Sequence, residues 1–119
     1  SGRWRSLMLR HVVLFKWKSK TSPEKIEEIE AALSGLPAKI PEIAGFEWGT
    51  DVSVQDFDAG FTHCLVVSLA SEHDRDVYLP HPAHAEFIAL SRPHVEDLIV
   101  VDYHPHDTTG AANGLGNEE

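Results

Sequence analysis

The feature that most constrains the fold is a change in the spacing of apolar residues near the start of the chain. From Leu9 to Trp17 the sequence LRHVVLFKW alternates with a period of two and is rich in β-branched and aromatic residues. This pattern is typical of a strand. The next segment, TSPEKIEEIEAALSGLPAKI, spaces its apolar residues at steps of three and four, which predicts an amphipathic helix lying on a sheet.

The ends of this helix carry their own signals. Thr21 or Ser22 can cap its start, and Pro23 suits its first turn. We expect it to end between Gly35 and Pro41. Its apolar positions are Ile26, Ile29, Leu33 and Leu36, and its outward face is expected to carry Glu27, Glu28 and Glu30.

Three further segments have the composition of strands. Residues 43–54 alternate loosely around Gly45 and Gly49, which predicts a strand with a bulge or bend. Residues 61–70 form another strand, and we expect the two to pair as a hairpin. A last strand is expected at residues 95–103.

Two helices are expected between the last two strands. A short helix capped by Ser71 should stop at Pro80, and a second should start at Pro82 and end near Pro93. The order is therefore βαββαβ, which defines an α+β, ferredoxin-like protomer. Helices on one face of four strands leave the other face uncovered, so we expect a homodimer formed through the open sheet face.

The chain is expected to form one domain with short flanking segments. Residues 1–8 read as a leader, 9–105 as the domain, and 106–119 as a disordered tail because that segment has almost no apolar content. The 119 residues suffice for one core and not for two.

Charge and cysteine content limit the partners and the compartment. Ten basic against nineteen acidic residues give a formal charge of −9, which opposes binding to nucleic acid or to an anionic membrane. No segment has the ~20 apolar residues of a membrane span. The single Cys64 lies in an apolar run and is expected to be a buried, reduced thiol, so we expect a cytoplasmic protein.

The sequence YLPHPAHAEF is the strongest candidate for a functional site. Because residues before proline avoid the helical region, Leu79 and His81 should both be extended, and His84 should lie in the first turn of the following helix. There the helix dipole would keep its ring neutral. His84 as base and Tyr78 as hydrogen-bond donor are the minimum set for removing a proton next to a carbonyl. The alternative is that these residues only shape a turn, with His81 capping the helix.

Polar residues on the strands add to this candidate site. His11 shares a face with Leu9, Val13 and Phe15, and His63 also lies on an apolar stripe. A buried polar group needs a partner, which a ligand can be, so we expect both histidines to line one cavity. A carboxylate from Asp102 can orient an imidazole.

Metal binding and nucleophilic hydrolysis are the rival chemistries. His81 and His84 have a spacing that could chelate, but the prolines restrict their geometry and no cysteine or glutamate stands at a usual ligand offset. We expect no metal site. The sequence contains no G-x-S-x-G motif, and the side chain of His63 should point away from Cys64.

Five segments, in this order and spacing, resemble the stress-responsive dimeric α/β barrel (Dabb) family: RHVVLFKW, WGTDVS, GFTHCLVVSL, YLPHPAH and the DY pair that ends the last strand. The resemblance covers residues 9 to about 105, and its most specific part is the Tyr-x-x-His-Pro-x-His block. It implies a ferredoxin-like protomer that dimerises through its sheet into a barrel.

The resemblance also implies roles for individual residues. In a polyketide cyclase of this family, the residues matching Tyr78 and His84 catalyse an intramolecular aldol condensation without a cofactor. The implied substrate-binding residues are His11, Val13, His63, His81 and Asp102. The first helix departs from that cyclase, because Ile29, Glu30 and Leu33 replace aromatic residues, so we expect a different substrate.

Three functions remain open on the sequence. The first is a cofactor-free enzyme of cyclase, lyase or isomerase type that acts on a small carbonyl or phenolic compound. The second is a stress-associated dimer without enzymatic activity. The third is a haem- or metal-binding barrel, because related dimeric barrels include haem-degrading enzymes. Fold alone does not choose among them.

Overall fold

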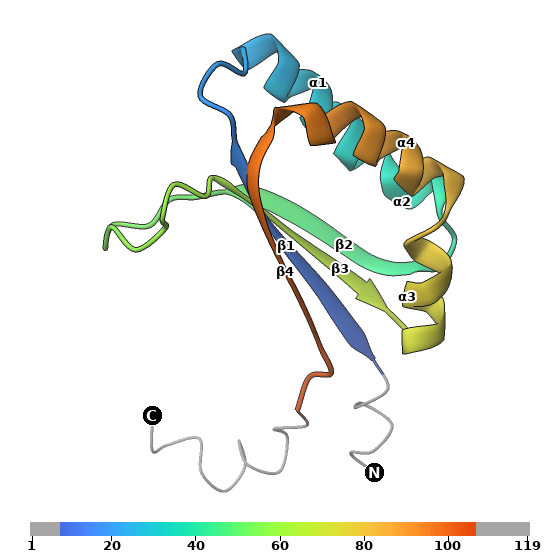
Figure 1. Cartoon of the computed structure of the whole chain (residues 1–119). Coiled ribbons are helices and arrows are strands. Elements are labelled where there is room, and N and C mark those ends of the chain that lie inside the picture. Colours follow the sequence, from blue (N-terminus) through green and yellow to red (C-terminus); the bar gives the residue numbers. More distant parts are fainter. Residues whose placement is uncertain (1–7, 107–119) are drawn as a thin grey trace, which may run out of the picture.

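The computed structural model describes residues 8–106, and the leader and tail expectations fall largely outside this range. A four-stranded sheet carries its helices on one face (Figure 1). The elements in chain order are β1 (Leu9–Trp17), α1 (Pro23–Ser34), α2 (Leu36–Lys39), β2 (Ile43–Thr50), β3 (His63–Leu69), α3 (Glu72–Tyr78), α4 (Pro82–Ser91), a 3-10 turn (Arg92–His94) and β4 (Val95–Tyr103).

The sheet has the strand order β2-β3-β1-β4, and every neighbouring pair is antiparallel. This is the ferredoxin-like α+β fold that the βαββαβ pattern predicts. The two central strands, β1 and β3, are far apart in sequence, while β2 and β4 form the edges. The expected β2–β3 hairpin is confirmed, and its register shifts between Ile43 and Gly45, where a bulge was predicted.

Local signals explain why the first helix begins and ends as it does. The Ser22 hydroxyl accepts a hydrogen bond from the Lys25 N–H at 3.1 Å, and Pro23 occupies the first turn. The helix α1 ends before Gly35, and the short α2 continues the chain to Lys39.

The hairpin loop is longer than the sequence indicates, because β2 ends at Thr50 and β3 begins at His63. The Asp51 carboxylate accepts hydrogen bonds from the N–H and hydroxyl of Ser53, and this local turn diverts the chain from the strand. The loop residues Asp56 and Ala59 also have positive φ, which no strand residue adopts.

The core lies between the sheet and the helices. Alternate residues of β1 and β3 point into it and are buried, which matches the period of two. They pack against Ile29 and Leu33 of α1 and Phe87 of α4. Tyr78, at the end of α3, is only 1% exposed and belongs to the same core.

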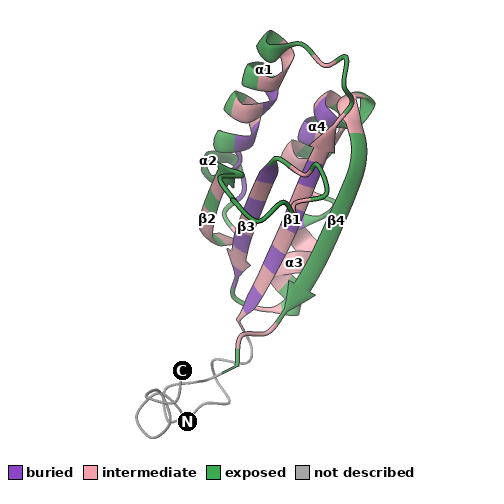
Figure 2. Cartoon of the chain, turned by 90° about the vertical axis from the view of Figure 1, so that its left-hand side faces the viewer, coloured by how far each residue is buried: buried purple, intermediate pink, exposed green. Residues whose placement is uncertain are grey.

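The opposite face of the sheet is apolar and carries no helix. Val12 of β1 pairs with Val66 of β3 and with Val101 of β4, and Leu14 pairs with Ile99. Figure 2 shows β4 exposed along its length and the β2–β3 loop passing in front of the sheet. We call the set Val12, Leu14, Val66, Ile99 and Val101 the open face. That this face is left uncovered is what the sequence predicted.

Candidate functional site

The predicted pair Tyr78 and His84 comes together where α3 meets α4. Tyr78 ends α3, and His84 lies in the first turn of α4. Their ring centroids are 4.6 Å apart, with the ring planes inclined by 44°. Tyr78 is buried and His84 is half-buried, so the pair lies at the margin of the core.

The short connection between the helices departs from the sequence prediction at one residue. Leu79 is helical, with φ −58° and ψ −44°, whereas we expected it to be extended because Pro80 follows. Its N–H donates to the Arg75 carbonyl at 2.9 Å, and this extra helical bond offsets the clash with proline. His81 is extended as predicted.

His84 is held in the tautomer that a general base needs. Its Nδ1 lies 2.8 Å from the carbonyl oxygen of Leu79. A carbonyl only accepts, so Nδ1 donates and the lone pair resides on Nε2. Burial lowers the pKa of His84, the charges of His11 and His81 lower it further, and the bond to Leu79 opposes them. At pH 7 the ring is therefore neutral and able to accept a proton.

Tyr78 differs from His84 in the direction of its pKa shift. Burial raises the pKa of Tyr78 to about 12. Its hydroxyl therefore keeps its proton at neutral pH and is able to donate a hydrogen bond. A neutral imidazole and a protonated phenol therefore stand side by side.

His11 packs on the other side of Tyr78 and is oriented by Asp102. The two residues are partners across the β1–β4 ladder, and His11 Nδ1 donates to Asp102 Oδ1 at 2.7 Å. The His11 ring meets the Tyr78 ring edge-on, with the centroids 5.7 Å apart. The expectation that Asp102 orients an imidazole is thus met. Val13, two residues along β1, is buried in the core beneath the helices.

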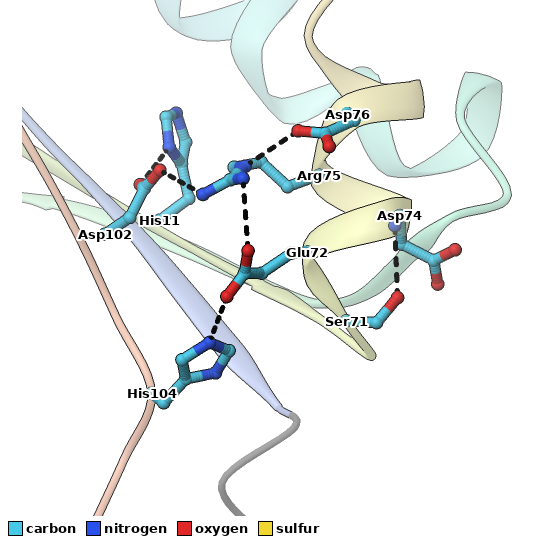
Figure 3. Close-up of polar contacts among 8 residues, drawn as sticks. All are labelled: His11, Ser71, Glu72, Asp74, Arg75, Asp76, Asp102 and His104. Atoms are coloured by element: carbon cyan, nitrogen blue, oxygen red, sulfur yellow. Dashed lines mark hydrogen bonds and ion pairs between the residues drawn. The ribbon is translucent and has the colours of Figure 1, made fainter.

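Sequence reasoning missed the charged residues around Asp102. Figure 3 shows Arg75 of α3 between carboxylates, with Nη1 3.4 Å from Asp102 Oδ2 and Nε 3.1 Å from Asp76 Oδ1. The Glu72 carboxylate lies 3.8 Å from Arg75 and accepts a hydrogen bond from His104 Nε2 at 2.7 Å. The contacts of Arg75 with Asp102 and of Glu72 with His104 have no local sequence signal, because they join α3 to residues at the end of β4 that are distant in sequence.

His63 does not join this group, contrary to the expectation of one shared cavity. It faces the helices as His11 does, but it pairs with Phe15 of β1, four positions along the strand from His11. At ~3.3 Å per residue this is roughly 13 Å. The period-two alternation places His11 and His63 on the same face of the sheet, but it does not bring their side chains into contact.

A second cluster surrounds His63. Its Nε2 donates to Glu30 at 2.8 Å, its Nδ1 accepts from the Trp17 indole N–H at 3.0 Å, and Trp48 stacks on the ring at 5.9 Å. Glu30 was expected to face outward, but it turns inward because a buried imidazole N–H needs an acceptor. Both ring nitrogens of His63 are therefore occupied within the protein.

His81 is engaged as a helix cap. Its Nδ1 accepts the backbone N–H of Ala83 at 3.0 Å, at the start of α4. This is the structural role that the sequence left open as an alternative. Within the described residues no group of three or more His, Cys, Asp or Glu side chains is arranged to hold a metal ion.

A cavity of about 600 Å³ opens between the β2–β3 loop and the open face. Its lining includes Trp48, Phe57, His63, Cys64 and Val66. Cys64 is half-buried here rather than buried, and burial, followed by the charge of Glu47, raises the pKa of its thiol. A smaller cavity of about 310 Å³ lies between Phe15, α4 and β4. Neither of these two cavities is lined by Tyr78 or His84.

Comparison with solved structures places the chain among dimeric ferredoxin-like proteins. It is similar to a dimeric ferredoxin-like protein of unknown function from Thermobifida fusca, with 30% identity and a TM-score of 0.74 over 82% of this chain and 91% of that one. It is also similar to a hydroxynitrile lyase from Passiflora edulis, with 31% identity and a TM-score of 0.79 over 85% of this chain and 95% of that one.

The family follows from the sequence comparisons. The model of the Stress responsive A/B Barrel Domain matches residues 9–105, and the chain belongs to this family. A stress-response A/B barrel domain-containing protein, HS1, from Arabidopsis thaliana is 35% identical over 97 residues, covering 82% of this chain and 89% of HS1. Olivetolic acid cyclase from Cannabis sativa is 29% identical over 99 residues, covering 83% of this chain and 98% of the cyclase. None of the helices within residues 8–106 has the length and apolar character needed to cross a membrane.

Proposed function

We propose that the protein is a cofactor-free enzyme that makes or breaks a carbon–carbon bond next to the carbonyl group of a small compound. The observation that carries this proposal is the pairing of His84 with Tyr78. The Nε2 atom of His84 is left basic by the bond from Nδ1 to Leu79, and the protonated hydroxyl of Tyr78 belongs to the adjacent ring.

The same two residues can serve either direction of such chemistry. In an aldol condensation, His84 Nε2 removes a proton from the carbon next to a carbonyl, and the Tyr78 hydroxyl donates to the resulting enolate oxygen. The enolate carbon then bonds to a second carbonyl carbon, whose oxygen takes the proton back from the His84 imidazolium.

Cleavage of a cyanohydrin uses the same proton transfers. His84 Nε2 takes the hydroxyl proton while Tyr78 stabilises the developing negative charge on that oxygen. The bond to the nitrile carbon breaks, a carbonyl forms, and the departing cyanide receives the proton from His84. The names of two relatives, a cyclase and a hydroxynitrile lyase, support a site of this kind.

The other predicted site residues contribute unequally to this proposal. We assign His11 and Asp102 to the wall of the site, because His11 contacts Tyr78 and Asp102 fixes its ring. Val13 follows His11 by two positions and His81 precedes His84 by three, and both remain expected substrate contacts. His63 lies near Glu30 of α1, away from the Tyr78–His84 pair, and would contact only a substrate long enough to reach from that pair to Glu30.

Turnover by matched variants tests the proposal. The wild-type protein, His84→Ala and Tyr78→Phe should be assayed for benzaldehyde release from mandelonitrile and for aldol closure of short β-polyketones. We expect activity in at least one assay, with losses of about 10²–10⁴-fold for His84→Ala and about 10²–10³-fold for Tyr78→Phe. His106→Ala, which changes an exposed histidine distant in sequence from the pair, is the control. Activity that survives His84→Ala would refute the assignment.

We further propose that the protein forms a homodimer through the open face and resides in the cytoplasm. Solved proteins of the same fold are described as dimeric, and a contiguous apolar sheet face usually marks an interaction surface. A free thiol suits a reducing compartment. Val101→Lys should convert the dimer to a monomer in sedimentation experiments, because Val101 is 52% exposed in the protomer and its substitution leaves the core intact. A Val101→Lys dimer would exclude this face.

A further inference from the structure

We propose that Arg75 is a positioning residue of the candidate site, which holds Asp102 and the end of α3 and thereby sets the His11 and Tyr78 rings beside His84. The proposal rests on the proposed function, since it names what keeps the proton-transfer pair in place. Arg75 itself touches neither Tyr78 nor His84 by any hydrogen bond or ion pair among the described residues.

The Asp102 carboxylate is shared between His11 and Arg75. Asp102 Oδ1 accepts from His11 Nδ1 at 2.7 Å, and Asp102 Oδ2 faces Arg75 Nη1 at 3.4 Å (Figure 3). Asp102 lies on the edge strand β4. Arg75 therefore holds this side chain from α3 while His11 holds it from β1.

Arg75 is itself held by Asp76 and Glu72. Its Nε donates to Asp76 at 3.1 Å, and its Nη2 lies 3.8 Å from Glu72. Glu72 is tied in turn to His104, whose Nδ1 donates to the Met8 carbonyl at 2.7 Å. One guanidinium thus faces three carboxylates, and the cluster joins α3 to the end of β4 and the start of β1.

Arg75 is linked to the proposed proton-transfer pair through Tyr78, which lies on the same helix. Tyr78 follows Arg75 by three positions in α3, so the two side chains project from neighbouring parts of one helix face. Tyr78 packs against His11 at 5.7 Å and against His84 at 4.6 Å. A shift of α3 or of Asp102 is therefore passed to both ring contacts.

The individual ion pairs are too exposed to explain much stability. Glu72 and Asp76 have side chains 60% and 64% exposed, and pairs of this kind are screened by water and salt. Geometry is more sensitive, because a misplacement of about 1 Å can cost about 10²-fold in rate. We expect loss of Arg75 to lower kcat about tenfold with KM nearly unchanged, since Arg75 does not contact the substrate.

The test compares Arg75→Met and Arg75→Lys with Arg92→Met, which removes the same charge at an exposed arginine on the 3-10 turn. The ring signals of His84, identified by their absence in His84→Ala, report its distance from the Tyr78 ring through the ring current. Arg75→Met should shift these signals and lower kcat for the active probe. Arg75→Lys should restore part of both, and Arg92→Met should change neither.

The two readouts separate this inference from the proposed function. Unchanged His84 signals and unchanged kcat in folded Arg75→Met would overturn the positioning role even if the wild-type protein is an enzyme. A wild-type protein that turns over neither mandelonitrile nor the β-polyketones would refute the proposed function for these substrates. The His84 signals of Arg75→Met would then still decide whether Arg75 sets the ring geometry.

Discussion

Replacing Asp102 by alanine tests the charged partner that orients His11. The His11 ring is 5% exposed, and the variant leaves its Nδ1–H without the acceptor at 2.7 Å. A hydrogen bond to an ionised group contributes about 1.5–3 kcal/mol, and an unpaired buried donor costs about 1–3 kcal/mol. The Asp102 side chain is 26% exposed, so water offsets part of this loss. We expect the free energy of unfolding to fall by about 2 kcal/mol.

Denaturant unfolding at one fixed protein concentration measures this change, because the stability of a dimer depends on concentration. At about 4–8 °C per kcal/mol for a domain of this size, the melting temperature should fall by about 8–16 °C. Asp97→Ala is the matched control: Asp97 lies on the same strand, and among the described residues its carboxylate accepts one hydrogen bond, from the neighbouring Leu98 N–H. A loss below about 0.5 kcal/mol for Asp102→Ala, or an equal loss in both variants, would show that Asp102 does not stabilise the buried His11 ring, since surface changes usually stay within that range.

Two further predictions concern pH. The pKa of His84 is lowered from 6.5 chiefly by burial, so kcat/KM should rise with pH through a midpoint below 6.5. Because the pKa of Tyr78 is about 12, kcat/KM should show no loss up to pH 9. A midpoint at or above 6.5 would contradict the assignment of His84 as the base. The pKa of His104 is raised from 6.5, first by its bond to Glu72 and then by the bond to Met8. The stabilising effect of His104 is therefore complete below pH 6.5 and is lost as pH rises through its raised pKa in the folded protein. In unfolding experiments His104→Ala should remove this part of the pH dependence of stability, whereas His106→Ala should not.

Much of the fold was predictable because local signals agreed with the global pattern. The bounds of β1 follow from its period of two and those of β4 from its composition, and the Ser22 cap with Pro23 marks the start of α1. The errors arose where a local hydrogen bond redirected the backbone. The Asp51 turn shortens β2, and the helical N–H of Leu79 prevails over the preference imposed by Pro80.

The candidate site was predictable only in part. Tyr78 and His84 lie six residues apart, so a helix end and a helix start suffice to bring them together. The contact of Asp102 with His11 depends on the β1–β4 register, and that of Glu30 with His63 depends on how α1 packs on the sheet. Helical periodicity assigned Glu30 to the outer face. Periodicity within one helix contains no information about the buried His63 N–H, to which the flexible Glu30 carboxylate binds.

The most direct test of a neutral base beside a phenolic donor is an NMR titration of the His84 ring, with its signal assigned by loss in His84→Ala. We expect this ring to titrate below pH 6.5 and its signal to move when a small β-diketone or benzaldehyde is added to the wild-type protein. A ring that titrates at or above pH 6.5 and responds to none of these compounds would contradict the role of His84 as a general base.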